Sequence, residues 1–195
     1  MEFRQDIKDY IRAEIETLQK LDVDSINEAI NLLLEAQKSH KHIYIFGNGG
    51  SSATASHFAN DFNKGISEYC EDKFRFICLN DNFPTVMAIA NDIGFEEVFR
   101  FQLKGVLEPG DIVIAISGSG NSKNVINAVE YAKEHGNKVI GLTGYDGGKL
   151  MKLSDVSFHV PVNSMQITED IHMAADHLMM SVINKNINGI DYIKK

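Results

Sequence analysis

Histidine and carboxylate side chains recur at helical spacing in two distant stretches of the chain. His57 and Asp61 are four residues apart, so in a helix they lie on one face, one turn apart. Near the other end of the sequence, Glu169, His172 and His177 stand among apolar residues. Zn²⁺ accepts imidazole nitrogens and carboxylate oxygens in a tetrahedral arrangement. A divalent metal held there could polarise a carbonyl group, and a ligand carboxylate could carry a proton.

The same spacing also has a plainer interpretation. A His and an Asp four residues apart are more often a surface pair than a ligand pair, and two histidines on one helix form no metal-binding signature. Asp176, beside His177, is expected to face solvent, although its carboxylate could orient an imidazole. Spacing alone therefore leaves the metal site open.

Three serines follow the most apolar short run of the chain. Residues 111–116 are apolar and β-branched after Asp111, which is typical of a strand buried on both faces. Ser117, Ser119 and Ser122 come next, separated by glycine and asparagine, and apolar residues then recur at helical spacing. The first N–H groups of a helix lack internal partners and lie at its positive end. The pattern indicates a phosphate site without a fixed positive charge.

A second strand, loop and helix of this kind stand earlier in the sequence. The apolar run 42–46 leads into the loop 47–52, GNGGSS, and a helix is expected from residue 52 to residue 64. Both loops have a plainer interpretation as turns with helix caps. Their repetition favours a phosphorylated small molecule at the carboxyl edge of an open sheet. The loop 47–52 lacks the third glycine of a dinucleotide-binding fingerprint, which makes a nucleotide-dependent oxidoreductase a remote alternative.

Strands and helices alternate from residue 42 onwards. Further strands are expected at 74–79, 138–142 and 155–160, and helices at 84–93, 95–106, 122–135 and 166–187. This order predicts an α/β three-layer sandwich with a mostly parallel, five-stranded sheet. Two helices, at 3–20 and from about residue 25, precede the first strand. Such a leading pair either packs against another subunit or covers its own domain.

The bulk composition limits the possible functions. The chain has 195 residues, 44% of them hydrophobic and 24% charged, which is ordinary for one globular domain. A formal net charge of −8 argues against a broad surface for nucleic acid or anionic membrane. There is no apolar run long enough to span a membrane, and Cys70 and Cys78 form no metal or redox spacing. A cytoplasmic protein is expected.

Taken together, these motifs resemble the sugar isomerase (SIS) fold and, within it, the phosphoheptose isomerases. The resemblance extends over nearly the whole chain, including the two leading helices. It rests on six motifs: GNGGSS at 47–52, HFAND at 57–61, AIANDIGFE at 88–96, GDIVIAISGSGNSKNV at 110–125, LTGYDGG at 142–148 and EDIHMAADH at 169–177.

The resemblance implies a flavodoxin-like sheet, a homotetramer that uses the helices of residues 1–40 for packing, and conversion of sedoheptulose 7-phosphate to an aldoheptose 7-phosphate. It implies a zinc site at His57, Asp61, Glu169 and His177, with Asp61 as the base and His177 as the acid. The implied substrate-binding residues are Asn48, Gly49, Gly50, Ser51, Asp92, Ser117, Gly118, Ser119, Ser122 and Glu169.

The sequence departs from the family pattern at several of these positions. Asp61 replaces a glutamate base, Glu169 replaces a metal-binding glutamine, and Gly118 replaces a threonine. The arginine that usually follows the base has no match, since Lys64 or Gly65 stands there. These changes leave another sugar phosphate, or a non-catalytic relative that binds a replication initiator, as alternatives to the heptose isomerase.

Overall fold

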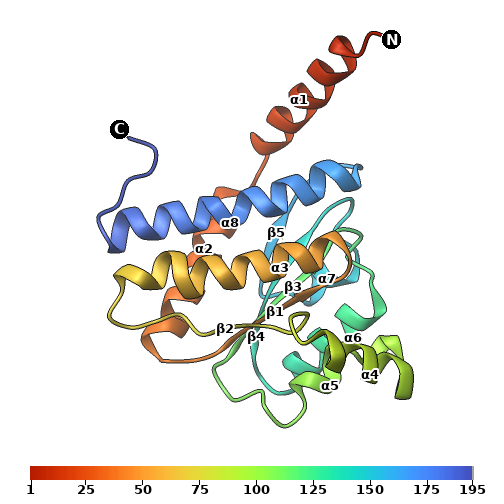
Figure 1. Cartoon of the computed structure of the whole chain (residues 1–195), viewed down its shortest axis with the longest axis vertical. Helices are drawn as coiled ribbons and strands as arrows, with labels where there is room; N and C mark the ends of the chain where they lie inside the picture. Colours follow the sequence, from red (N-terminus) through yellow and green to blue (C-terminus); the bar gives the residue numbers. More distant parts are fainter. Residues whose placement is uncertain (195) are drawn as a thin grey trace.

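Five short strands form one sheet, and all of them run parallel. The computed structural model describes residues 1–194 (Figure 1). The strand order is β2-β1-β3-β4-β5, so the connections change direction between β1 and β3, which are neighbours. In such open sheets the ligand binds outside the carboxyl ends of the strands at this switch point. The strands are β1 (Ile43–Gly47), β2 (Phe76–Cys78), β3 (Ile112–Ser117), β4 (Lys138–Thr143) and β5 (Val156–His159).

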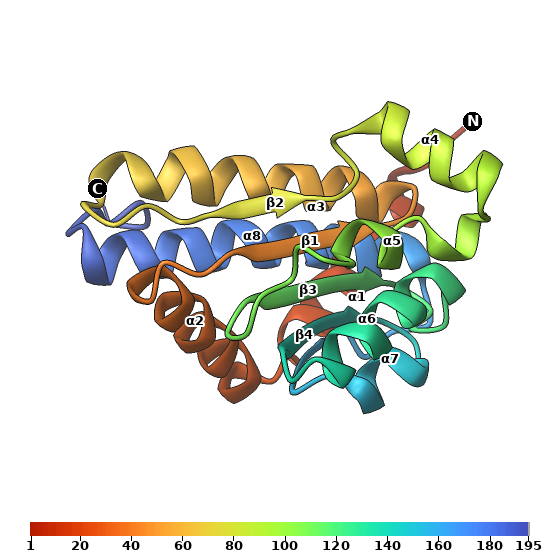
Figure 2. The same cartoon turned by 90° about the horizontal axis from the view of Figure 1, so that it is seen from below.

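Helices cover both faces of the sheet, as Figure 2 shows. Successive strand residues point to opposite faces, so Ile43 and Ile45 join one apolar cluster, whereas Tyr44 and Phe46 join the other. The first cluster packs under α2, α3 and α8, and the second under α4, α5, α6 and α7. The helices are α1 (Arg4–Leu18), α2 (Val23–Lys38), α3 (Gly50–Asn60), α4 (Phe83–Asp92), α5 (Arg100–Leu103), α6 (Lys123–Glu134), α7 (Gly148–Leu153) and α8 (Met165–Ile187).

The predicted α/β sandwich with a parallel five-stranded sheet is confirmed, and the differences are local. The helix expected at 95–106 is broken into a 3₁₀ turn, Phe95–Glu97, and the single turn of α5. The helix expected at 52–64 begins earlier, at Gly50, and continues after Asn60 as a π-helical segment, Asp61–Ile66. π-Helical segments inside helices are rare, and those that do occur are frequently found at functional sites.

The two leading helices differ in where they lie. α2 packs on the domain itself and buries Ile26, Ala29, Ile30 and Leu33. α1 extends away from the body of the molecule (Figure 1), and Tyr10 donates a hydrogen bond to the carboxylate of Asp170 on α8. Within residues 1–194, no helix combines the length and the apolar character that a membrane span needs.

Candidate active site

The two loops rich in serine and glycine meet at the carboxyl edge of the sheet. One follows β1 and the other follows β3, and these strands pair in register through Gly47 and Ile116. The side-chain amides of Asn48 and Asn124 donate to each other's oxygens, both at 2.9 Å. Asn124 is only 2% exposed. This reciprocal pair ties the start of α6 to the loop before α3, so both loops border one space.

A third loop, after β4, completes the support of the serines. Gly144 N donates to Gly118 O at 2.8 Å, and Leu150 N donates to Gly120 O at 2.9 Å. Gly120 has a φ of +66°, and a Cβ there would lie 2.1 Å from the carbonyl oxygen of Gly147. Only glycine satisfies both the backbone conformation and this close approach. The loop of residues 118–122 is therefore held against a neighbouring backbone.

The serine hydroxyls do not cap the helix that they precede. Ser122 stands at the N-cap of α6 without a side-chain bond to the helix, and its hydroxyl instead accepts from Ser117 Oγ at 3.1 Å. The N-cap of α3 is Gly49, which has no side chain to offer. Neither N-cap side chain bonds to its helix, so first-turn N–H groups remain available to an anion, except that of Val125, which donates to Asn124 Oδ1 at 2.9 Å. This arrangement disfavours the interpretation of the loops as capped turns.

A cavity of about 150 Å³ opens between these loops and the first turns of α8. Its lining combines hydroxyls and amides with one carboxylate, and includes Asn48, Ser51, Ser117, Gly118, Ser119, Ser122 and Glu169. The sequence prediction placed these residues in one substrate site, and the structure brings them together. Gly49 lies in the same loop as the N-cap of α3, and Gly50 is the first residue of that helix, between Asn48 and Ser51 in sequence.

Glu169 lies where α8 meets the start of α3. A Cβ at Gly50 would be 2.5 Å from Glu169 Oε2, so the glycine makes room for the carboxylate. The positive end of a helix dipole stabilises a negative charge at this position. Asp92, which was expected to touch the sugar, ends α4, is exposed, and is not among the residues that line this cavity.

A cluster of imidazoles and carboxylates lies further along the same two helices. α3 and α8 run side by side across one face of the molecule (Figure 1). His57 Nε2 is 3.1 Å from His177 Nε2 and 3.5 Å from the Oδ2 atom of Asp61. The fourth member is Asp176, whose Oδ2 atom is 3.8 Å from His57 Nε2. One donor atom from each of the four side chains lies within 4.8 Å of the others.

The prediction that Asp176 faces solvent is wrong. Its side chain is fully buried, and both carboxylate oxygens lack a hydrogen-bond partner. Burial, and after it the nearby charge of Asp61, raises the pKa of Asp176 to about 8. A helical pattern with polar residues on both sides does not show which side is covered. Because α8 packs against both α3 and the π-helical segment, position 176 is covered as well.

The cluster has the composition and spacing of a divalent metal centre. Donors around a tetrahedral Zn²⁺ with bonds of 2.0–2.2 Å are separated by about 3.3–3.6 Å. Four donor pairs of the cluster, at 3.1–3.8 Å, are close to this separation, and all donors lie within 4.8 Å of one another. The buried carboxylate without partners also needs a cation or a proton. His57, Asp61 and His177 were predicted as ligands together with Glu169. The structure gathers the first three with Asp176, while the Glu169 carboxylate lies at Gly50.

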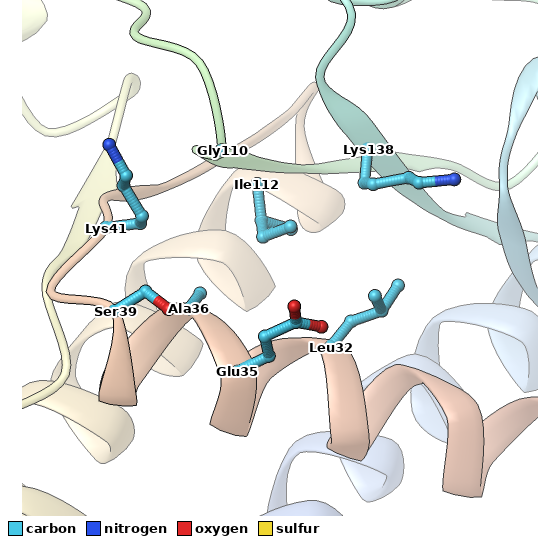
Figure 3. A pocket seen from close by; sticks show the side chains of 8 residues that line it. All are labelled: Leu32, Glu35, Ala36, Ser39, Lys41, Gly110, Ile112 and Lys138. Atoms are coloured by element: carbon cyan, nitrogen blue, oxygen red, sulfur yellow. The ribbon is translucent and has the colours of Figure 1, made fainter.

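Another cavity, of about 270 Å³, lies at the opposite, amino edge of the sheet (Figure 3). Leu32, Ala36 and Ile112 give it an apolar lining, with Glu35, Lys41 and Lys138 around them. None of the serine loop or cluster residues lines it. The residues of the serine-loop cavity and of the imidazole and carboxylate cluster therefore lie at the carboxyl edge of the sheet and along α3 and α8.

Comparison with known proteins gives a consistent result over most of the chain. The family model described as "SIS domain" matches residues 6–144. A phosphoheptose isomerase of Leptospira biflexa is 37% identical over 186 residues, which cover 95% of each chain. A phosphoheptose isomerase of Helicobacter pylori is 35% identical over 186 residues, covering 92% of this chain and 91% of the relative.

Solved structures show the same similarity in three dimensions. The phosphoheptose isomerase GmhA of Neisseria gonorrhoeae superposes with a TM-score of 0.86 at 32% identity, covering 94% of this chain and 100% of that chain. A phosphoheptose isomerase of Francisella tularensis gives the same TM-score at 27% identity, covering 95% of this chain and 100% of the other.

Proposed function

The chain belongs to the SIS-domain family of phosphoheptose isomerases, and we propose that it interconverts a ketose and an aldose phosphate at the carboxyl edge of its sheet. Membership of this family makes it a phosphosugar isomerase. The observation that carries the proposed site is the meeting of the two uncapped serine and glycine loops beside Glu169. Sedoheptulose 7-phosphate is the proposed substrate, and a glycero-manno-heptose 7-phosphate is the product.

The loops hold the phosphate end of the substrate. Ser117, Ser119 and Ser122 supply hydroxyl donors, and the starts of α3 and α6 supply backbone N–H groups. Asn48 and Ser51 border the same cavity and contact the adjoining part of the sugar. Hydroxyl and amide donors fit a phosphate without adding a fixed positive charge to a chain whose net charge is −8.

The isomerisation moves one proton between neighbouring carbons. Asp61 removes the proton from C1 of the ketose and returns it to C2, while His177 gives a proton to the oxygen on C2 and receives the one from the oxygen on C1. No electrons are lost or gained in the net reaction. A carboxylate and an imidazole within 3.7 Å of each other suit the two proton transfers, because each is a common general acid or base.

Zinc is the metal proposed for the cluster of His57, Asp61 and His177. Two imidazoles and a carboxylate match the donors that Zn²⁺ accepts. The chemistry that such an ion supplies when bound is polarisation of a carbonyl oxygen. The buried, unpartnered oxygens of Asp176 support a cation at this place.

A coupled isomerase assay tests the activity directly. Purified protein, with Zn²⁺ and after treatment with a chelator, is given sedoheptulose 7-phosphate, and formation of the aldose is measured. We expect turnover that falls on chelation and returns with Zn²⁺. Absence of turnover with seven-, six- and five-carbon ketose phosphates would contradict the proposal and favour a relative that binds without catalysis.

A homotetramer is the proposed assembly. The support is α1, which leaves Phe3, Ile7, Ile11, Ile15 and Leu18 between 38% and 57% exposed in the single chain. A row of apolar side chains of this size on a projecting helix is a common feature of a subunit interface. α2 packs on its own sheet, so α1 is the member of the leading pair that is available to another subunit.

A further inference from the structure

Within the described part of the chain, Asp176 is the one acidic residue whose carboxylate oxygens are both buried without a hydrogen-bond partner. Its side chain is fully buried and neither carboxylate oxygen has a hydrogen-bond partner, although Asp61 and His57 are close to it. Burial of a carboxylate without a partner costs several kcal/mol unless the group is neutralised. This carboxylate lies beside two imidazoles whose Nε2 atoms are 3.1 Å apart. A cation bound between these groups would offset the free-energy cost of burying the carboxylate.

Glu169 lies in a different environment on the same helix. Its carboxylate lies against Gly50, the first residue of α3, and it lines the cavity of the serine loops. His57 is seven residues further along α3, which corresponds to roughly 10 Å of helix. The start of α3 already stabilises the charge of Glu169 through the helix dipole. Glu169 therefore faces the substrate cavity and has no comparable need for a cation.

Both possible ligand sets contain two imidazoles and two carboxylates, which balance the charge of a divalent ion. The sets differ in the carboxylate that is left out. With Glu169 as the ligand, Asp176 would stay buried without a hydrogen-bond partner. With Asp176 as the ligand, Glu169 keeps its place at Gly50 in the lining of the substrate cavity.

We propose that Asp176, and not Glu169, completes the metal centre of this chain together with His57, Asp61 and His177. Glu169 then acts on the substrate side, as a carboxylate that accepts hydrogen bonds from the sugar hydroxyls within the cavity of the serine loops. This inference rests on the proposed function for the presence of a metal, and it assigns which carboxylate holds the metal.

Measurement of bound metal shows whether Asp176 or Glu169 is the ligand. Wild-type protein and the variants Asp176→Asn and Glu169→Ala are loaded with Zn²⁺ or Co²⁺ and dialysed against a weak competing chelator. Alanine is used at position 169 because a glutamine there could itself bind the metal. Bound metal is then measured by elemental analysis and by the visible absorption of Co²⁺. Asp170→Asn, an exposed acid on the same helix, is the matched control, and thermal unfolding shows that each variant folds.

We expect Asp176→Asn to weaken metal binding by about 100-fold or more and to change the Co²⁺ spectrum. Glu169→Ala and Asp170→Asn should keep stoichiometric metal and the wild-type spectrum. Glu169→Ala should instead lower kcat/KM for the sugar phosphate by about tenfold, as loss of a hydrogen bond to a charged group predicts.

The opposite pattern would overturn the inference. Retention of metal by Asp176→Asn would show that Asp176 is not needed as a ligand, and loss of metal from Glu169→Ala would show that Glu169 is one. If Asp176→Asn fails to fold, the metal content of Glu169→Ala still decides the question. Wild-type protein without stoichiometric metal would remove the metal from the proposed function as well, which distinguishes that failure from the failure of the ligand assignment alone.

Discussion

The hydroxyl of Ser119 illustrates how single residues divide between binding and folding. Ser119 lies in the loop after β3 and lines the cavity with Ser117 and Ser122. Its Oγ accepts one weak hydrogen bond, from Asn121 N at 3.3 Å, and Asn121 is exposed. Little folding energy therefore depends on this hydroxyl, which leaves it free for a ligand.

We predict that Ser119→Ala weakens sugar-phosphate binding by about 10- to 150-fold, because a hydrogen bond to a charged group contributes about 1.5–3 kcal/mol. The midpoint of thermal unfolding should hardly change. Isothermal titration calorimetry measures the binding affinity, and differential scanning calorimetry measures the unfolding midpoint. Ser39→Ala, at the cavity on the opposite edge, is the control and should alter neither. Equal losses of binding and stability in Ser119→Ala would mean that the loop acts only as a turn.

His172 gives a prediction about pH. It is 1% exposed, its Nε2 atom lies 3.2 Å from the carbonyl oxygen of Thr143, and burial lowers its pKa to about 4. A histidine pKa below its unfolded value means that the folded state binds the proton less readily than the unfolded state. The free energy of unfolding contributed by this group is complete above pH 6.5 and is lost as the pH falls towards 4.

At pH 5 this loss should be on the order of 2 kcal/mol relative to pH 7. Denaturant unfolding of the wild type and of His172→Gln at both pH values measures it, because glutamine keeps a side-chain N–H donor and does not titrate. The variant should lose less stability on acidification than the wild type does. Identical losses would show that His172 does not titrate as its burial requires.

The sequence predicted which residue types gather at the carboxyl edge, but it did not predict all of their partners. His57, Asp61 and His177 were expected together, because both helices start at the same edge. Asp176 was misassigned because position 176 is adjacent to a cluster residue, and only the packing of α8 shows that it is covered. The pairing of Asn48 with Asn124 has no sequence signal, since it joins residues that are 76 positions apart.

At the scale of elements, the first turn of α3 leads to a test in which stability and activity separate. A Cβ at Gly50 would meet both carboxylate oxygens of Glu169, at 2.5 and 2.7 Å, so the flexible glutamate has to move. Gly50 needs no positive φ, and alanine is favoured over glycine in helices by about 1 kcal/mol.

We therefore expect Gly50→Ala to keep or slightly raise the midpoint of thermal unfolding. The same variant should lower kcat/KM by about tenfold or more, because a displacement of about 1 Å in an active site can cost about 100-fold in rate. Kinetic assays and thermal unfolding on the same preparation measure both effects. Unchanged kinetics would show that the position of Glu169 does not matter to the reaction.

Strands were easier to predict than helix boundaries, for a physical reason. β1 and β3 are apolar on both faces, as parallel strands in a covered sheet must be. The segment 95–106 was instead predicted as one helix. In the structure Val98, Phe99 and Leu103 are all buried, and the chain breaks into a 3₁₀ turn and one short helix. Tertiary packing thus overrides a local pattern that remains compatible with several conformations.

At the scale of the whole molecule, the exposed apolar side chains of α1 are the basis for the proposed homotetramer. We expect light scattering to give four chains of 21.7 kDa each. The double variant Ile7→Glu with Ile11→Glu should produce smaller species, because charges would replace two exposed apolar side chains on α1. Lys8→Glu, a charge change on the same helix, is the control and should leave the tetramer intact. A wild-type monomer at micromolar concentration would contradict the proposed assembly.

The parallel course of α3 and α8 has a consequence for the size of the molecule that the enzyme accepts. The serine loops lie at the start of α3, and His57 lies roughly 10 Å along the same helix. The two helices thereby act as a molecular ruler. Under the proposed function, with the phosphate at the serine loops and the reacting carbons at His57, Asp61 and His177, this separation favours an extended, open-chain sugar phosphate over a shorter one.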